Sequence, residues 1–515
     1  MPVVSMIVEL AGAKYSKYDR GSARPESELH GRVMNIVEPI FVQSENKPSE
    51  LALCAPGTDF NIVSYARLRR SVNSICRRFI SAGIMPHNRL AVLIDDPVLD
   101  AMVLIALTRL GVVTISGKLP GLAWPVKIDG VVADRPYEFP EGRTILADPT
   151  WTMDNDQSIE EKYLYRAAPD EVCRLFLTSG TNSRENVIAM TNRMIMARLD
   201  RQKLFLGPRA PFCDRTCLEL PLTTPLGFQV LLATLWRGGV LVIAQGDRET
   251  IAALTTYGVE NLVASPKGIL RLANAIENQP GSYPALKAAF CAGTMGSQPT
   301  CERVRAQLCP NLTIGYAAAD ATMVASMPVH FASGVFGAVG YVLPGVTVEI
   351  IDEEGHPLQP GNEGEMRIRS DYGVTEYLEN QADTQRAFRD GWFYPGDRGR
   401  LTGENMLILS GSAESARIVG EQKDIERIEE VLSEHANVVR CGVLSVANKS
   451  GTDELCALVV PRSYLDVEAF RTYCKARLPS DLVPSRFVAF FDLPEDDKGK
   501  VDRAKLPALL KNKLN

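Results

Sequence analysis

The 515-residue sequence lacks any long hydrophobic run. Its longest apolar stretch, Ala101 to Leu107, is far shorter than the roughly 18 residues that a membrane-spanning helix needs. The N-terminus has no basic segment before an apolar core, so a secretory signal peptide is not expected. We therefore expect a soluble, cytoplasmic protein with no membrane span.

Clusters of metal-binding or disulfide-forming residues are missing as well. The eleven cysteines are dispersed and include no C-x-x-C pair, which indicates buried, inert thiols in a reducing compartment. None of the five histidines has a ligand-like spacing, so neither a zinc site nor a Ser-His-Asp triad can be argued. The net charge is −6 and basic residues are scattered, so no nucleic-acid partner is expected.

Hydrophobic patterns in the first part of the chain indicate alternating helices and strands. Ser64 can cap a helix that runs to Ala82, and a short apolar strand follows at Leu90 to Ile94. A helix ending near Leu110 and another strand come next, and the alternation recurs between Val240 and Ala264. This order is typical of parallel βαβ units, and the chain is long enough for two or more domains.

From about Gly337 the pattern changes. Two alternating strands, Val346 to Ile351 and Gly364 to Ile368, flank an acidic turn and predict a smaller antiparallel subdomain. After Gly411 an amphipathic helix, two strands and a further helix predict a compact α+β unit. We therefore expect an N-terminal domain over residues 1–410 and a C-terminal domain over residues 411–515, with a hinge at residues 411–414.

Small polar residues follow the strand Leu175 to Leu177. Small hydroxylated residues and glycine expose backbone N–H groups with little steric bulk, which suits an anion. No Gly-Lys-Ser/Thr follows, so the loop is not a Walker loop, and such a run taken alone is more often an ordinary turn. The loop residues with a phosphate-binding role in this interpretation are Thr178, Ser179, Gly180, Thr181 and Asn182.

Together with the rest of the chain, this loop resembles the T-S-G-T-T-G-x-P-K-G-V loop of the adenylate-forming superfamily. That superfamily includes acyl-CoA synthetases, luciferases and peptide-synthetase adenylation domains, and the resemblance runs from about Leu51 to Leu506. Ser183 replaces the second glycine, Glu185 the proline, and Asn186 the lysine that would meet the triphosphate. Losing this cation could slow the first half-reaction, but the backbone donors remain.

Residues 314–320 resemble the family's Y-G-x-T-E motif. The resemblance implies that Tyr316 stacks on adenine and that Asp320 holds Mg²⁺ near the phosphates. Ala319 lacks the hydroxyl that would contact the α-phosphate. Without the family, the same stretch also fits a strand that runs into the start of an alanine-rich helix.

Two further segments resemble the nucleotide half of the family site. Ala292 and Gly293 correspond to the small-residue turn beside adenine. Residues 391–397 match the G-W-x-x-T-G-D turn, with Pro395 in place of the threonine. A carboxylate directly after a glycine can accept both ribose hydroxyls, so Asp397 is expected to hold the ribose.

The hinge is poorly matched and the C-terminus well matched. Residues 411–420 fit the family's G-R-x-D-x-x-I-K-x-x-G pattern only with one residue deleted; Ser412 replaces the arginine, and Arg417 stands for the lysine. Residues 494–503 follow the P-x-x-x-x-G-K-x-D-R pattern. The resemblance makes Lys500 the mobile catalytic lysine that bridges the substrate carboxylate and the nucleotide.

The resemblance implies an acyl pocket between the segment Leu222 to Gln229, the turn near Gly293 and a helix after Asp320. That segment holds no acidic residue for an ammonium group, and an unpaired buried amine costs several kcal/mol, so an α-amino acid is disfavoured. The side chains that favour an apolar or aromatic acid are Leu226, Phe228 and Met323.

The resemblance implies an α/β fold with a large N-terminal domain of two doubly wound subdomains and a small β-subdomain, plus a smaller mobile α+β domain. It implies an acid–thiol ligase that uses ATP and Mg²⁺, with coenzyme A as acceptor or, alternatively, a carrier protein's phosphopantetheine thiol. The departures at Ser183, Asn186, Ala319 and Ser412 leave open a catalytically silent relative that binds an adenylate or a protein partner. An oxidative, luciferase-like second step has no distinguishing residue.

Overall fold

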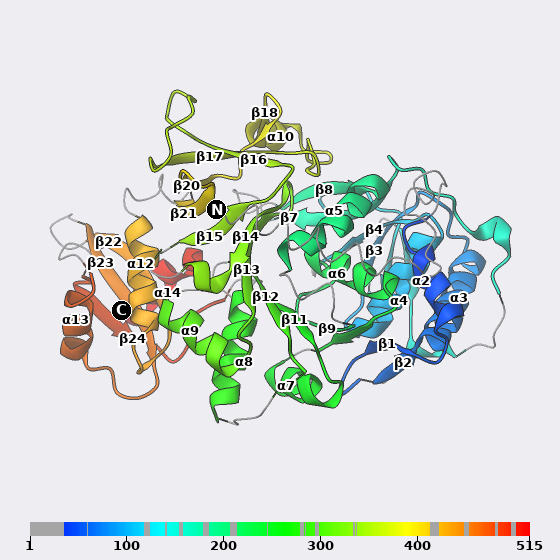
Figure 1. Ribbon diagram of the computed structural model, residues 1–515, viewed down its shortest axis with the longest axis horizontal. Helices are drawn as coiled ribbons and strands as arrows, with labels where there is room; N and C mark the ends of the chain where they lie inside the picture. The colour runs from blue at the N-terminus through cyan, green and yellow to red at the C-terminus, as the bar shows by residue number, and fades with distance from the viewer. Residues whose placement is uncertain are drawn as a thin grey trace, which may run out of the picture.

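The computed structural model describes most of the chain. The described residues are 35–58, 60–117, 124–137, 139, 142–153, 158–178, 185–206, 214–244, 246–278, 283, 285–293, 298–332, 335, 337–412, 422–447, 453–478, 483–495 and 501–514. They form an α/β protein with a large N-terminal domain and a smaller C-terminal domain, as the sequence predicts (Figure 1).

The first sheet has six strands in the order β6-β5-β3-β4-β7-β8. All neighbours pair in parallel except β7 and β8, an antiparallel pair that flanks the predicted phosphate loop in sequence. The strands are β3 (Arg89–Leu93), β4 (Val113–Ser116), β5 (Gly130–Ala133), β6 (Arg143–Leu146), β7 (Val172–Thr178) and β8 (Asn186–Thr191). The helices nearby in sequence are α2 (Glu38–Asn46), α3 (Tyr65–Ser81), α4 (Pro97–Arg109) and α5 (Asn192–Phe205).

Side-chain caps explain where α3 and α4 begin. The Ser64 hydroxyl accepts a hydrogen bond from the backbone N–H of Arg67 at 3.2 Å, as the sequence predicts. Asp96 caps α4 in the same way through the N–H groups of Val98 and Leu99. Since α4 is buried over nearly its whole length, it reads as apolar on every face.

The second sheet has fifteen strands and begins with a parallel region, in which β1 also pairs antiparallel with β2. These strands are β1 (Leu51–Cys54), β2 (Ile62–Ser64), β9 (Arg215–Leu218), β10 (Val240–Ile243), β11 (Asn261–Ala264), β12 (Ala288–Ala292) and β13 (Leu312–Ala318). The helices in this region are α6 (Pro225–Trp236), α7 (Asp247–Thr256), α8 (Pro266–Asn278) and α9 (Gln298–Gln307).

The same sheet continues into the predicted β-subdomain through antiparallel strands. They are β14 (Thr322–Pro328), β15 (Ala338–Val342), β16 (Val346–Ile351), β17 (Gly364–Ser370), β18 (Phe388–Arg389), β19 (Trp392–Phe393), β20 (Asp397–Leu401) and β21 (Met406–Ser412), with α10 (Gln381–Ala387) beside them. The β-subdomain is therefore hydrogen-bonded to the second α/β sheet without a break.

The smaller domain has a three-stranded sheet in the order β22-β23-β24. Its elements are α12 (Gln422–Ser433), β22 (Val438–Ala447), β23 (Asp453–Pro461), α13 (Val467–Lys475), β24 (Arg486–Ala489) and α14 (Leu506–Leu514). Ile425, Ile428 and Leu432 of α12 are buried in its core. The domain lies at one end of the molecule, opposite α3 and α4 (Figure 1).

The prediction of a helix after Asp320 is wrong, because residues 322–328 form strand β14, which is antiparallel to β13. Its first six residues are all buried, so the strand has no polar face and its alternation cannot be read from the sequence. Thr322 adopts a φ of 98°, which is strained for a β-branched residue. A tight turn and a buried strand thus replace the helix.

The described residues bear on two expectations, the burial of the cysteines and the lack of a membrane span. The ten described cysteines are all buried, and burial raises the pKa of a thiol such as Cys76 to about 12, as expected for inert thiols. Among the described helices, none is both long and apolar enough to cross a bilayer.

Candidate active site

The candidate site lies at the carboxyl ends of β12 and β13, where open α/β sheets bind ligands. Ala292 ends β12 opposite Gly315, and the next residue, Gly293, also bridges Gly315. Gly293 has a φ of 142°, and a Cβ there would lie 2.9 Å from Cγ of Pro266. Only glycine fits this turn. Because Gly293 bridges Gly315, the turn lies beside the next residue, Tyr316.

Tyr316 and Asp397 meet in this site. The tyrosine hydroxyl donates a short hydrogen bond to Oδ2 of Asp397, the first residue of β20. Burial raises the pKa of Tyr316 well above its ordinary value, and the Asp397 charge adds to the effect, so the hydroxyl remains a donor. The residues predicted to hold adenine and ribose are thus in contact.

Asp320 lies in the turn between β13 and β14, close enough to Tyr316 for their charges to interact. Burial raises the pKa of Asp320, whereas a hydrogen bond from Tyr377 and the charge of Arg198 oppose the rise. Its Oδ1 is buried and has no hydrogen-bond partner within the described ranges.

This orphaned carboxylate oxygen fits a magnesium ion. Mg²⁺ is usually held by one or two carboxylates together with substrate phosphates, so a single carboxylate is sufficient. The part of the chain that the structure describes contains no group of three or more His, Cys, Asp or Glu residues, which argues against an all-protein metal cage there.

Arg198 of α5 belongs to the site, although the sequence interpretation missed it. Its side chain is buried; Nε donates to the Tyr372 carbonyl at 2.9 Å and Nη1 to the Ala319 carbonyl at 3.0 Å. Burial lowers the pKa of Arg198 to about 9 and the Asp320 charge opposes the fall. The available signal was an arginine on the helix face that also carries Ile195 and Leu199.

The described part of the phosphate loop is its base. Thr178 ends β7 and pairs with Asn186, the first residue of β8. Asn186 is buried and its Oδ1 accepts a hydrogen bond from Nδ2 of Asn380 at 2.7 Å. Asn186, at the position of the family lysine, therefore forms a structural hydrogen bond to Asn380. The predicted residues Ser179, Gly180, Thr181 and Asn182 lie outside the described residues.

The segment 377–380 connects this base to the metal candidate. The N–H of Leu378 donates to the Val187 carbonyl at 2.8 Å, and Tyr377 hydrogen-bonds to Asp320. The N–H of Val374 also donates to the Asp320 carbonyl at 2.7 Å. The strand pair around the phosphate loop and the turn that carries Asp320 are thus held to one another.

Lys500 and Arg417 both lie outside the described residues, so their roles stay predictions. The structure describes the residues on either side of the Lys500 segment, Glu495 and Val501, which form an isolated antiparallel bridge. Just beyond it, Arg503 Nη2 contacts Glu429 Oε2 of α12 at 2.5 Å. This ion pair fixes the segment's C-terminal end on the smaller domain.

The expected acyl-pocket residues differ in exposure. Leu226 is half-buried, whereas Met323 is buried. Phe228 is also buried and packs with its ring centroid 6.3 Å from that of Phe176 and 4.5 Å from the Arg174 guanidinium carbon. Of the three, Leu226 has the most surface available for an acid, and the other two belong to the supporting core.

A buried carboxylate next to this segment was also missed. Glu219 precedes the expected pocket segment, and its Oε1 pairs with Arg271 Nη2 at 2.8 Å. Arg271 also contacts Asp247 at 2.6 Å. Glu219 is thus already engaged by Arg271, which it shares with Asp247, so a substrate ammonium group would have to compete with Arg271 for it.

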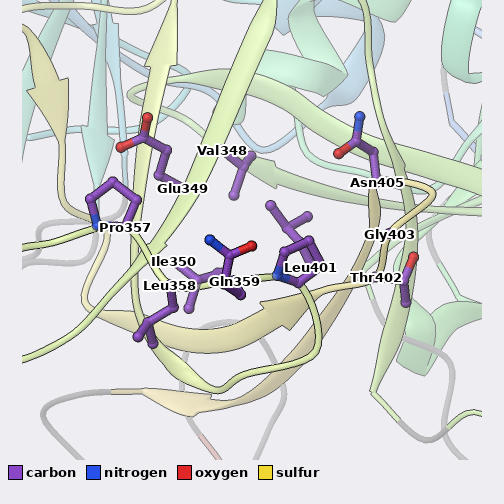
Figure 2. A pocket seen from close by; sticks show the side chains of 11 residues that line it. Val348, Glu349, Ile350, Pro357, Leu358, Gln359, Leu401, Thr402, Gly403 and Asn405 are labelled. Carbon is purple, nitrogen blue, oxygen red and sulfur yellow. The ribbon is translucent and has the colours of Figure 1, made fainter.

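A small cavity lies in the β-subdomain between β16, residues 357–360 and residues 401–405 (Figure 2). Its volume is about 130 Å³, well below the ~300 Å³ at which ligand pockets usually begin. None of the predicted site residues lines it, and its one acidic side chain, Glu349, pairs with Arg367 at 2.6 Å. It does not compete with the Tyr316–Asp397 site.

Comparison with known proteins identifies the family of the chain. Residues 126–378 match the family model described as AMP-binding enzyme, and residues 427–500 match the AMP-binding enzyme C-terminal domain. A 2-succinylbenzoate–CoA ligase of Bacillus licheniformis is 26% identical over 340 residues, covering 65% of this chain and 70% of the relative. The Bacillus mycoides enzyme of the same name is 24% identical over 460 residues, covering 87% and 94%.

Solved structures share the fold. The o-succinylbenzoate CoA synthetase from Bacillus subtilis, in complex with its acyl-adenylate intermediate, superposes with a TM-score of 0.75 at 18% identity, covering 91% of this chain and 97% of that one. An amide bond synthetase from Marinactinospora thermotolerans gives 0.72 at 22% identity, covering 92% and 99%. With both family models matched in order along the chain, the protein belongs to the adenylate-forming superfamily of AMP-binding enzymes.

Proposed function

We propose that the protein is an ATP-dependent acid–thiol ligase. It activates a carboxylic acid as an acyl-adenylate with release of pyrophosphate and then transfers the acyl group to a thiol, with coenzyme A as the acceptor. The observation that carries the proposal is the contact between Tyr316 and Asp397 beside the Ala292–Gly293 turn. The 2-succinylbenzoate–CoA ligases among its relatives support the same reaction class.

In the first half-reaction a carboxylate oxygen attacks the α-phosphorus of ATP, and pyrophosphate leaves. Tyr316 offers a ring face to adenine, and Asp397 accepts hydrogen bonds from the ribose hydroxyls. Asp320 would hold magnesium, which supplies positive charge to the phosphate oxygens when bound. Lys500 neutralises the charge that develops at the attacked phosphorus, and holding both reactants together supplies much of the acceleration.

In the second half-reaction the acceptor sulfur attacks the acyl carbon and AMP leaves. The proposed smaller domain, residues 411–515, turns about residues 411–414 between the two steps. Ser412 is the last residue of β21 and pairs directly with Asp397 of β20. The proposed hinge thus begins beside the ribose-binding carboxylate, which links domain rotation to nucleotide contact.

The acid is apolar or aromatic in this proposal. Leu226 presents apolar surface, and the nearby Glu219 is already paired with Arg271. An α-amino group would have to compete with Arg271 for Glu219 or stay unpaired, at a cost of about 1 to 3 kcal/mol. Succinylbenzoate, named for the relatives, is an aromatic acid of this class.

A second candidate function follows from Asn186. Its side chain is engaged by Asn380, so the base of the loop offers no cation to the triphosphate at this position. A protein of this kind could bind an acyl-adenylate without making it. A carrier-protein thiol is the remaining alternative for the acceptor in an active enzyme.

Acid-dependent exchange of labelled pyrophosphate into ATP separates these functions. An acid–thiol ligase catalyses exchange and forms a thioester when coenzyme A is added. Exchange without consumption of coenzyme A identifies a carrier protein or another acceptor. Tight AMP binding without exchange for any acid identifies the silent relative and rejects the ligase.

A further inference from the structure

We propose that Arg198 is a positioning residue for the triphosphate. From helix α5, it supplies the positive charge that the phosphate loop lacks at position 186. This inference rests on the proposed function. At that position Asn186 is buried and hydrogen-bonded to Asn380. The guanidinium of Arg198 instead contacts the turn that carries Asp320, through its hydrogen bond to the Ala319 carbonyl.

The hydrogen bonds of Arg198 hold two segments of the site. Nη1 donates to the carbonyl of Ala319, and Nε donates to the carbonyl of Tyr372. These two acceptors lie 53 residues apart in the sequence. The turn is thereby fixed to the segment that leads to Tyr377, the hydrogen-bond partner of Asp320. Nη2 is buried and has no hydrogen-bond partner among the described residues.

The charge balance of this buried region points to an anionic ligand. Arg201, one helical turn after Arg198, is also buried, and its guanidinium carbon lies 4.2 Å from the centroid of the Tyr372 ring. Its Nη1 donates to the Pro344 carbonyl, whereas its Nε and Nη2 have no partner within the described ranges. Asp320 is the anion whose charge acts on Arg198. Among the described groups whose charges act on Arg198, Asp320 is the one carboxylate and Arg201 is a second cation.

Burying a cation without a matching anion is costly, and carbonyl contacts alone do not require a permanent charge. A bound polyphosphate would balance the excess. Because Arg198 and Asp320 are buried, an attraction between the guanidinium and the phosphates would be screened less than it is in water. Its contribution should therefore increase with the number of phosphates, while adenine and ribose contacts stay unchanged.

Calorimetric titrations of the full chain with adenosine, AMP and Mg·ATP, without acid, test this pattern. We expect Arg198→Met to weaken Mg·ATP binding by about tenfold or more, AMP by about threefold and adenosine by less than about twofold. Arg198→Lys, which keeps the charge, should stay within about threefold of the wild type for Mg·ATP. Arg201→Met is the comparison variant: it removes the second buried charge, whose hydrogen bond goes to Pro344 instead of the turn, so we expect a smaller phosphate-dependent loss than in Arg198→Met.

Equal losses for all three ligands in Arg198→Met would mean a scaffold role and would overturn the proposal, as would no loss. An equally phosphate-dependent loss in Arg201→Met would overturn the assignment to Arg198. If Arg198→Met does not fold, the comparison of Arg198→Lys with Arg198→Gln decides, since the charge is the property in question. Wild-type binding of Mg·ATP without pyrophosphate exchange would reject the ligase and leave this inference standing.

Discussion

The hydroxyl of Tyr316 donates a hydrogen bond to Asp397, although the two residues lie 81 positions apart in the sequence. The contact joins β13, the last parallel strand of the second sheet, to β20 of the antiparallel region. It places an aromatic ring and a carboxylate side by side at the carboxyl edge of the sheet. In the proposed function, nucleotide binding depends on this pair.

We expect Asp397→Asn to weaken AMP binding by roughly 100-fold, because two ribose hydroxyls lose a charged acceptor. Tyr316→Phe keeps the ring and should weaken binding by only about three- to tenfold. Calorimetric titration with AMP measures both, and the double variant shows whether the two losses are coupled. Additive losses would mean that the Tyr316–Asp397 hydrogen bond has no part in AMP binding.

Asn186→Lys should not restore a phosphate-binding lysine. Asn186 is 5% exposed and accepts the hydrogen bond of Asn380, so we expect a loss of about 1 to 3 kcal/mol in unfolding free energy and no gain in the rate of exchange. Urea unfolding and pyrophosphate exchange measure the two effects. Asn380→Ala is the control for the lost link alone. A faster variant of unchanged stability would contradict the structure here.

The stability of the protein should depend on the ionisation of Asp100. Burial raises its pKa from 3.8 to about 7, while the charge of Arg174 opposes the rise. Between these two values the folded state binds the proton more tightly than the unfolded state does. The contribution to stability is therefore full below pH 4 and is lost as the pH rises through about 7.

Asp100→Asn cannot titrate and should lack this slope. Between pH 4.5 and pH 8 we expect wild-type stability to fall relative to the variant by on the order of 2 to 4 kcal/mol. Urea unfolding of both proteins at the two pH values measures the difference. Parallel pH profiles would show that Asp100 is ionised in the folded protein across this range.

Substitution of Leu226 should weaken the use of the acid and leave the binding of ATP unchanged. We expect Leu226→Ala to lower kcat/KM for a benzoate-type acid by about tenfold through lost apolar contact, with the KM for ATP within about twofold of the wild type. In the wild type, α-amino acids should be at least about 100-fold poorer substrates than such acids. A screen in which only amino acids turn over would overturn the assigned acid class.

Much of the fold could be predicted because the signals are local. The Ser64 cap and the apolar face of α12 both lie where the sequence predicts them. The strand after Asp320 could not be recognised, since it is buried on both faces and follows a turn strained at Thr322. Motif resemblance predicted the residues that meet here, Tyr316 and Asp397, from segments far apart in the sequence.

Other parts of the site depend on tertiary structure that no local pattern encodes. The helix face that carries Ile195 and Leu199 indicates that Arg198 points inward, but not that its guanidinium reaches the turn at Ala319. The pairing of Glu219 with Arg271 likewise joins residues from separate βα units. Lys500 and the hinge stay predictions from the resemblance.

The most direct test of the central claim is acid-dependent exchange of labelled pyrophosphate into ATP, measured with a panel of aromatic acids for the wild type, Lys500→Ala and Asp397→Ala. The account predicts exchange in the wild type, loss of at least about 100-fold in both variants, and AMP binding that Lys500→Ala keeps and Asp397→Ala loses. Wild-type exchange that persists unchanged in both variants would contradict it.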